Sequence, residues 1–306
     1  LLEFDLIKNA FIYIEQKLEE MNHQWFKNRV YAITTNGTMF TKENKEFFEK
    51  YSRLWSIGIS IDGDECSTDM NRGKGTYKKI IEHFKWWRKY FYWNSIKATV
   101  NNKTISKLYE NVIHLNQDLG LDTIYINSVF EDVWKESDNE IFREQLYKLA
   151  DYLLTDNNYK KIHVSFFSSA YYNENTKFAF CGCGNSMISV DTEGVLYPCT
   201  RFHTEKSSKY PIGDINKSFI NKDKLIPFAF CNIDNLRGEY KEKCKKCEAK
   251  SMCSWCLAYD YSQTKSLFKK GYINCEMVKI RYEVNRYFFK KVEKLDEVEI
   301  HIKEVI

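Results

Sequence analysis

The sequence predicts an α/β fold of parallel strands, followed by a small cysteine-rich domain. Over roughly the first 150 residues, short apolar runs alternate with stretches whose apolar residues recur every three or four positions, the pattern of strands joined by helices. Nine of the ten cysteines, all three prolines and half of the twelve glycines lie beyond residue 180. This shift in composition predicts a domain boundary near residue 170, with domains at 1–170 and 171–306.

The first domain is expected to alternate helices and strands in a regular order. Its expected helices cover 4–21, 41–51, 77–91, 108–119 and 142–153, and its expected strands cover 30–33, 57–61, 96–100 and 124–129. The strands begin 27 to 39 residues apart, which indicates parallel strands joined by right-handed crossovers. This repeat is typical of a (β/α) barrel or a doubly wound sheet. No Gly-x-Gly-x-x-Gly follows any of these strands, so a dinucleotide-binding fold has no support.

The second domain is expected to hold little regular structure. Residues 187–191 and 194–197 predict a β-hairpin, and 212–215 predict a further turn. The apolar stripe from Met277 to Leu295 predicts a closing helix. Because a hairpin and loops bury little apolar surface, we expect bound metal to contribute to the stability of this domain.

The cysteines of the second domain have the spacing of metal ligands. They are Cys181, Cys183, Cys199, Cys231, Cys244, Cys247, Cys253, Cys256 and Cys275. Thiolates at short, repeated intervals surround a soft metal centre without needing a large fold to position them. Disulfides are disfavoured because disulfide-dense scaffolds are usually much shorter than this chain. The isolated tenth cysteine, Cys66, is not expected to be a ligand.

Zinc and iron–sulfur clusters remain as alternatives for these nine thiols. Paired Cys-x-x-Cys knuckles are typical of zinc, but such knuckles usually lie about 15–20 residues apart. Here five residues separate Cys247 from Cys253. One zinc ion would also leave five of the nine thiols unexplained, whereas two four-iron clusters use eight. The spacing therefore favours iron–sulfur clusters.

Polar residues lie at or just after the carboxyl ends of four consecutive predicted strands. They are Thr35, Asn36, Ser60, Asp62, Asn101, Asn127 and Glu131. In parallel α/β folds, ligand sites form on the loops after the carboxyl ends of the strands. Any one of these residues alone is more typical of a turn or a helix cap. Their coincidence on consecutive strands indicates a ligand-binding site.

Composition indicates the cellular location of the protein and excludes some classes of partner. The chain is 43% hydrophobic and 29% charged with a net charge of +4, which is typical of a globular protein with a lysine-rich solvated surface. No stretch of eighteen apolar residues occurs, so we expect no membrane partner. The lack of an aromatic-basic motif argues against a nucleic-acid partner. The free-thiol chemistry expected of the cysteines agrees with a reducing, cytoplasmic location.

Taken together, these motifs resemble the radical S-adenosylmethionine (radical SAM) peptide maturases that carry a SPASM domain. The cysteine string from Cys183 to Cys275, including Gly194, resembles the SPASM pattern. Segments 35–37 (Thr-Asn-Gly) and 60–63 (Ser-Ile-Asp-Gly) are similar to segments that line the SAM pocket of that family. The resemblance covers essentially the whole chain. It is closest to maturases of cysteine-repeat peptides, judging from the sequences around Cys199 and Cys253.

The resemblance implies a fold, cofactors and partners. It implies a partial (β/α)6 barrel lacking its first two βα units, followed by a SPASM domain with two auxiliary [4Fe-4S] clusters. It assigns the first cluster to Cys181 or Cys183, Cys199 and Cys256, with Cys231 as a possible additional ligand, and the second to Cys244, Cys247, Cys253 and Cys275. SAM and a third cluster would serve the intact enzyme. The implied partners are a ribosomally made precursor peptide and an electron donor such as flavodoxin or ferredoxin.

The implied reaction is thioether cross-linking of the peptide through a 5′-deoxyadenosyl radical. In sulfatase-maturing relatives an aspartate follows the cysteine that matches Cys199, whereas Thr200 stands here and is a poor base. That difference argues against the sulfatase-maturing reaction class.

Two departures from the family pattern qualify this expectation. Two residues separate Cys253 from Cys256 where the family has three. The family's Cys-x-x-x-Cys-x-x-Cys motif and GGEP segment are missing, and Leu1 resembles the continuation just past GGEP. We therefore expect a truncated enzyme that is inactive alone. The alternative from another class is a catalytically silent iron–sulfur module that binds a peptide or scaffolds a partner.

Overall fold

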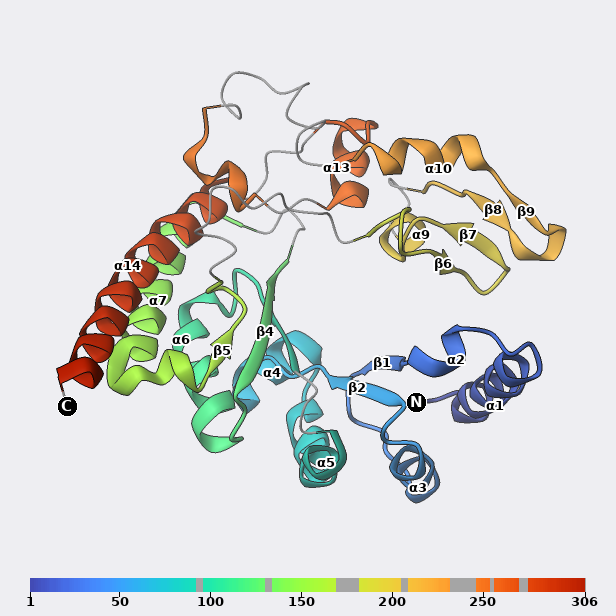
Figure 1. The fold of residues 1–306 in the computed structure, drawn as a ribbon, viewed down its shortest axis with the longest axis horizontal. Helices are drawn as coiled ribbons and strands as arrows, with labels where there is room; N and C mark the ends of the chain where they lie inside the picture. The colour runs from blue at the N-terminus through green and yellow to red at the C-terminus, as the bar shows by residue number, and fades with distance from the viewer. Residues whose placement is uncertain are drawn as a thin grey trace. The chain divides into compact units, whose positions relative to one another are not determined.

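The structure of the protein is a computed structural model (Figure 1). It describes residues 1–91, 96–129, 134–168, 182–204, 209–231, 246–253, 256–269 and 275–305. The chain forms two compact units. Unit 1 comprises Leu1–Val129 and Glu144–Phe166, and unit 2 comprises Phe130–Arg143 and Phe167–Ile306.

Unit 1 alternates strands with helices. Its elements are α1 (Phe4–Glu20), α2 (Trp25–Asn28), β1 (Tyr31–Thr35), α3 (Lys42–Lys50), β2 (Trp55–Ile59), α4 (Glu65–Arg72), α5 (Thr76–Phe91), β3 (Ile96–Val100), η1 (Ile105–Lys107), α6 (Leu108–Ile113), η2 (His114–Asp118), β4 (Thr123–Ser128), the later part of α7 (Glu136–Leu154), η3 (Thr155–Lys160) and β5 (His163–Val164).

The strands of unit 1 are parallel and lie in sequence order. β1 pairs with β2, and β3 pairs with β4, which in turn pairs with β5. A parallel bridge between Ser60 and Lys97 connects these two groups of strands. The predicted mixed α/β fold with parallel strands is confirmed. Closure into a partial barrel remains a prediction.

Helices cover one face of this sheet. Trp87 of α5 is fully buried and donates its indole N–H to the carbonyl oxygen of Ile57 at 2.6 Å. Phe48 of α3 packs edge-on against Trp55, with ring centroids 5.2 Å apart. Figure 1 shows α3 and α5 on the same side of β1 and β2. The apolar residues of the strands point to this side, which explains why the strands appear in the sequence as short apolar runs.

The opposite face of the sheet is polar and open, and we call it the open face. Burial alternates along β3 and β4, so that Lys97 and Tyr125 are exposed between buried neighbours and Asn127 is exposed next to the buried Ile126. Parallel sheets in α/β proteins usually bury both faces. The open face carries these residues: Ala32, Thr34, Ser56, Gly58, Ser60, Lys97, Thr99, Tyr125, Asn127 and His163.

Each predicted element of unit 1 has a counterpart in the structure, but several bounds and short elements differ. β2 covers Trp55–Ile59 rather than 57–61, α7 begins at Glu136 rather than at 142, and α2 and η3 were not predicted. The expected helix 108–119 begins as a 3₁₀ turn and ends as the π-helical segment η2, followed by Gly120 with a φ of 65°. Helix α4 was not predicted, because its residues carry no apolar stripe. Its start is nevertheless encoded by Asp64, whose carboxylate accepts the backbone N–H of Ser67 at 2.7 Å. The short strand β5 was also missed.

Unit 2 contains a small sheet and several helices. Its elements after the first part of α7 are β6 (Ser189–Val190), β7 (Val195–Tyr197), α9 (Arg201–Thr204), β8 (Gly213–Asp214), η5 (Ile215–Lys217), β9 (Phe219–Ile220), α10 (Lys222–Ala229), η6 (Glu248–Ser251), α13 (Leu257–Thr264) and α14 (Cys275–Val305).

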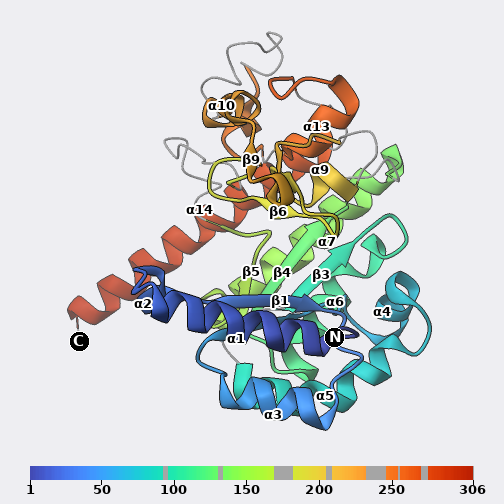
Figure 2. The ribbon, with the colours of Figure 1, turned by 90° about the vertical axis from the view of Figure 1, so that its right-hand side faces the viewer.

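The sheet of unit 2 is antiparallel throughout, in the order β6-β7-β8-β9. The predicted hairpin is confirmed by the pairing of β6 with β7. The predicted closing helix is also confirmed, and Figure 2 shows α14 as one continuous helix. An ion pair between Arg143 and Glu283, at 3.2 Å, ties the start of α7 to α14. In the part of the chain that the structure describes, no helix is long and apolar enough to cross a membrane.

Candidate functional site

The polar residues predicted to form a site lie at the ends of neighbouring strands. Thr35 ends β1, and its carbonyl oxygen accepts the backbone N–H of Ser60, just past β2, at 2.9 Å. Asn101 follows β3 directly, and Asn127 lies near the end of β4, whereas Glu131 lies outside the described residues. Because the strands are parallel, these residues share one edge of the sheet. Asn36 and Asn127 are exposed there, whereas Ser60 and Asn101 are half-buried.

The Thr35-Asn36-Gly37 segment forms a tight turn at this edge. The hydroxyl of Thr35 accepts the backbone N–H of Gly37 at 3.2 Å, and the side-chain oxygen of Asn36 accepts that of Thr38 at 3.2 Å. Gly37 has a φ of +71°, and a Cβ there would lie 2.9 Å from Ile59. Glycine is needed because the turn is left-handed and lies directly on β2. The buried Thr35 thus shapes the turn and leaves Asn36 open to a ligand.

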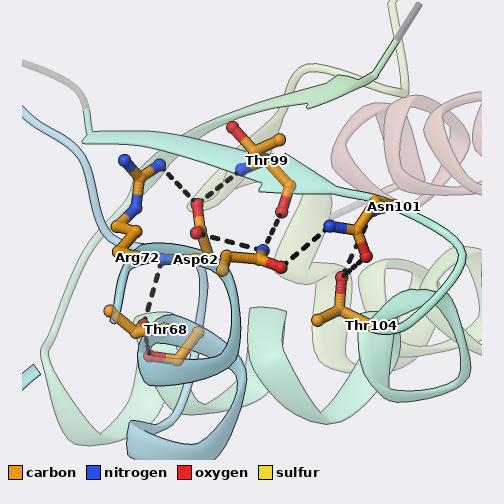
Figure 3. Close-up of polar contacts among 8 residues, drawn as sticks. Asp62, Thr68, Arg72, Thr99, Asn101 and Thr104 are labelled. Carbon is orange, nitrogen blue, oxygen red and sulfur yellow. Dashed lines mark hydrogen bonds and ion pairs between the residues drawn. The ribbon is translucent and has the colours of Figure 1, made fainter. Parts of the chain in front are cut away.

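Asp62 is the centre of a buried polar network (Figure 3). Its side chain is fully buried, and its carboxylate accepts the backbone N–H of Thr99 at 2.7 Å and the Arg72 guanidinium at 2.7 Å. The Asn71 amide donates to the second carboxylate oxygen at 3.1 Å. These contacts join the loop after β2 to β3 and α4. The carboxylate is therefore engaged within the protein, and its role is to position the strand ends.

Asn71 and Arg72 are site residues that the sequence analysis missed. The Asn71 amide also donates to the carbonyl of Thr99 at 3.1 Å, and Asn101 donates to the side-chain oxygen of Asn71 at 2.9 Å (Figure 3). The Nε atom of Arg72 is buried and has no hydrogen-bond partner among the described residues. A buried, unpaired donor on a cation is costly, so it favours an acceptor from a ligand. The only signal in the sequence was the position of both residues in α4, which itself went unpredicted.

Gly63 offers a direct test of how tightly this loop is packed. Its φ is +141°, and a Cβ there would lie 2.1 Å from the side chain of Asn111, which accepts the backbone N–H of Asp64 at 3.1 Å. We expect Gly63→Ala to destabilise the protein by on the order of 2 kcal/mol more than Gly75→Ala. Gly75 is a matched control, since its φ is +81° and a Cβ there would meet nothing within 4 Å. Urea unfolding of both variants measures the difference, and equal losses would contradict this packing.

One group of thiols lies in the apolar core of unit 2. Cys183 is buried in this core together with Cys231, and Cys199 and Cys256 pack against it. A hydrogen bond from the Cys183 thiol lowers the pKa of Cys199 to about 6, helped by the backbone N–H groups at the start of α9. Burial raises the pKa of Cys256, and the charge of Cys199 raises it further. Cys183, Cys199 and Cys256 therefore share one neighbourhood.

A second group of thiols lies where η6 meets α14. Cys247 packs against the buried Met252 and Tyr282, and Cys275 is the first residue of α14. A hydrogen bond to Glu276 chiefly raises the pKa of Lys279, and the charges of Cys247 and Cys275 act in the same direction. One ammonium group thus lies near both thiols, where it would offset the negative charge of a thiolate-bound centre.

The thiols fit two separate centres only in part. Cys181 and Cys244, two of the eight predicted ligands, lie outside the described residues. Among the described residues, no three His, Cys, Asp or Glu side chains are arranged to hold a metal ion. What fits is the donor chemistry, because the described cysteines of unit 2 are free thiols, and thiolates are the usual ligands of iron–sulfur clusters.

Solved structures with this arrangement of elements include enzymes that bind AdoMet. One is anSMEcpe with bound AdoMet, an anaerobic sulfatase-maturating radical SAM enzyme with a SPASM domain. Its sequence is 19% identical to this chain, and the two structures match with a TM-score of 0.67 over 93% of this chain and 77% of that chain. A second structure of anSMEcpe, with bound AdoMet and the Cp18Cys peptide, gives 19% identity and a TM-score of 0.67 over 94% and 82%. The chain has the fold of radical SAM maturases.

A more distant likeness points to the same fold. Streptococcus suis SuiB bound to S-adenosylmethionine, a radical SAM peptide maturase, is 15% identical with a TM-score of 0.52, over 78% of this chain and 58% of that chain. No protein-family model and no curated protein sequence matches the chain. The radical SAM maturase fold therefore rests on the arrangement of the elements rather than on sequence identity.

Within this radical SAM maturase fold, Cys231 in the apolar core of unit 2 and Cys199 beside that core are expected to differ in reactivity. Cys199 has a pKa of about 6, whereas burial raises the pKa of Cys231 to about 11. The thiolate is the reactive form, so alkylation of Cys199 in the metal-free chain should rise as the pH passes about 6 and level off near neutrality. Cys231 should stay unmodified over this range. Mass spectrometry after iodoacetamide pulses measures both, and equal rates at pH 7 would contradict the assigned environments.

Proposed function

We propose that this chain belongs to a radical SAM enzyme that modifies a ribosomally synthesised, cysteine-rich peptide by forming thioether cross-links through a 5′-deoxyadenosyl radical. The observation that carries the proposal is the combination, in one chain, of a parallel sheet with an open polar face and two separate groups of thiols. Solved enzymes of the same fold have been captured with AdoMet and with peptides, namely Cp18Cys on anSMEcpe and SuiA on SuiB. These likenesses support SAM and a peptide as ligands here.

Unit 1 would bind SAM at the carboxyl ends of its strands. The exposed Asn36 and Asn127 and the half-buried Ser60 and Asn101 are placed to contact such a ligand. Thr35 and Asp62 would act through the backbone, since their polar groups hold the turn after β1 and the loop after β2. We propose that these strands are part of a (β/α)6 barrel, in which this edge of the sheet forms the mouth.

Unit 2 would hold two auxiliary [4Fe-4S] clusters, and the domain division would lie near residue 170. Cys183, Cys199 and Cys256 would serve the first cluster with Cys181, and Cys247, Cys253 and Cys275 would serve the second with Cys244. Such clusters, when bound, supply one-electron transfer. Cys231 is disfavoured as a ligand, because its thiol donates to the carbonyl of Pro227 at 3.3 Å and burial raises its pKa to about 11. Electrons would come from a flavodoxin or ferredoxin, in a reducing cytoplasm.

A second candidate is a catalytically silent iron–sulfur module that binds a peptide. The observation in its favour is that the 306 residues contain no Cys-x-x-x-Cys-x-x-Cys. Such a motif leaves one iron open for SAM, whereas a cluster ligated by four thiolates offers no vacant position.

The two candidates are separated by adding the missing motif. The chain, alone and fused after a segment that carries Cys-x-x-x-Cys-x-x-Cys and GGEP, is reconstituted and treated with SAM and dithionite. We expect 5′-deoxyadenosine from the fusion and none above background from the chain alone. A fusion that holds its third cluster but forms no 5′-deoxyadenosine would favour the silent module. Robust formation of 5′-deoxyadenosine by the chain alone would contradict the claim that SAM cleavage requires the Cys-x-x-x-Cys-x-x-Cys motif.

A further inference from the structure

Lys97 projects from the middle of the open face. It lies on β3, between the buried residues Ile96 and Ala98, and its side chain is exposed. Its neighbours across the sheet are Ser60 on one side and Tyr125 on the other. In parallel strands, paired residues point to the same face, so these three side chains form one row across the open face.

Among the residues that the structure describes, no carboxylate pairs with this ammonium group. Lys97 donates to the hydroxyl of Thr34 at 3.1 Å, and it forms no ion pair with any residue that the structure describes. No acidic residue occurs in β1, β2, β3, β4 or β5. The carboxylate at the nearby strand end, Asp62, is fully buried and paired with Arg72. The described strands of the open face therefore carry a positive charge at Lys97 and no acidic residue.

The surroundings of Lys97 leave room for a ligand. On the side of β1 and β2, the open face carries only small side chains, at Ala32, Thr34, Ser56, Gly58 and Ser60. On the other side stands Tyr125, 45% exposed and in edge contact with His163, with ring centroids 5.8 Å apart. A surface of small side chains that carries one cation and is flanked by an aromatic ring suits a ligand that is anionic at one end.

We propose that Lys97 is the anion-binding residue of this face and takes a carboxylate of the bound ligand, with the hydroxyls of Thr34 and Ser60 as flanking donors. A single ammonium and two hydroxyls match one carboxylate, whereas a polyphosphate is usually held by a glycine-rich loop, and no Gly-x-Gly-x-x-Gly follows these strands. The inference rests on the proposed function, since both the methionine end of SAM and an acidic peptide carry a carboxylate. Lys97 thereby adds a specificity-determining residue to the site.

The test compares ligands that differ only in the carboxylate. Four probes are used: SAM, decarboxylated SAM, a cysteine-containing peptide with one glutamate and blocked ends, and the same peptide with glutamine. Dissociation constants are measured by ligand-observed NMR for the wild type, Lys97→Met and Lys97→Arg. Lys79→Met is the matched control, because Lys79 is exposed on α5 and has no ion pair among the described residues. Thermal unfolding checks that all four proteins are equally folded.

We expect the wild type to prefer the carboxylate-bearing member of one pair by about tenfold, the effect of one charge-assisted hydrogen bond. Lys97→Met should abolish that preference, while Lys97→Arg and Lys79→Met should keep it. The pair that shows the preference identifies whether the carboxylate belongs to SAM or to the peptide.

Two other outcomes overturn the inference in distinguishable ways. If the wild type binds SAM or the peptide and Lys97→Met binds each probe with the same dissociation constant as the wild type, Lys97 is not a subsite and the proposed function stands. If the wild type binds none of the four probes, both the subsite and the proposed ligand class are contradicted.

Discussion

Replacing Cys247 by alanine is expected to remove about four of roughly eight iron atoms from the anaerobically reconstituted chain, because one thiolate of the second cluster is lost. Cys247 packs beside the start of α14, and the Lys279 ammonium lies near both Cys247 and Cys275. A cluster at this position would be held by both segments, so loss of one ligand should empty the site. Iron and acid-labile sulfide per chain measure the effect.

Cys66→Ala provides the control for this prediction. Cys66 is exposed on α4 in unit 1, outside both groups of thiols. Its replacement should leave iron and sulfide unchanged. Equal losses from both variants would show that the thiols are not divided as assigned, and no loss from either would exclude Cys247 as a ligand.

Replacing Asp62 by alanine is expected to lower the free energy of unfolding by about 3–5 kcal/mol, the range found when one partner of a buried ion pair is removed. The variant would leave the Arg72 guanidinium without its carboxylate and the Thr99 N–H without its acceptor. These contacts join α4 and β3 to the loop after β2, so this loop should loosen as well, although the Ile61 N–H still donates to the carbonyl oxygen of Lys97 at 3.1 Å. Urea unfolding followed by circular dichroism measures the loss.

A surface carboxylate supplies the comparison for this variant. Asp118 pairs with His114 at 2.6 Å, but its side chain is 67% exposed. Exposed pairs contribute only about 0–1 kcal/mol, so Asp118→Ala should be nearly neutral. An Asp62→Ala protein no less stable than Asp118→Ala would contradict the central role of the network.

The sequence predicted most strands of unit 1 because their apolar residues face the helices. The runs around Ile57 and Ile124 had to be apolar to pack under α5 and its neighbours, and that need is visible in the sequence. The open face was missed, although Lys97 and Tyr125 interrupt apolar runs with the alternation of a one-sided sheet. Helix α4 was missed because its pattern is that of a capped, polar segment.

Partners in the site are harder to predict than the residues themselves. Asp62 was correctly placed at a strand end, but its partners are Arg72, ten residues away, and Thr99, thirty-seven residues away. Such pairings depend on how β2, β3 and α4 pack, which no local pattern encodes. The same applies to the thiols, since spacing predicts that cysteines bind metal but the chain path decides that Cys183 lies beside Cys199.

The central claim is that this chain carries two auxiliary iron–sulfur clusters in unit 2, and the most direct test is its metal and sulfide content. The chain is purified anaerobically, reconstituted with iron and sulfide, and analysed for iron, zinc and acid-labile sulfide. The account predicts a brown protein with about eight iron and eight sulfide per chain. A colourless protein with stoichiometric zinc and no acid-labile sulfide would contradict it.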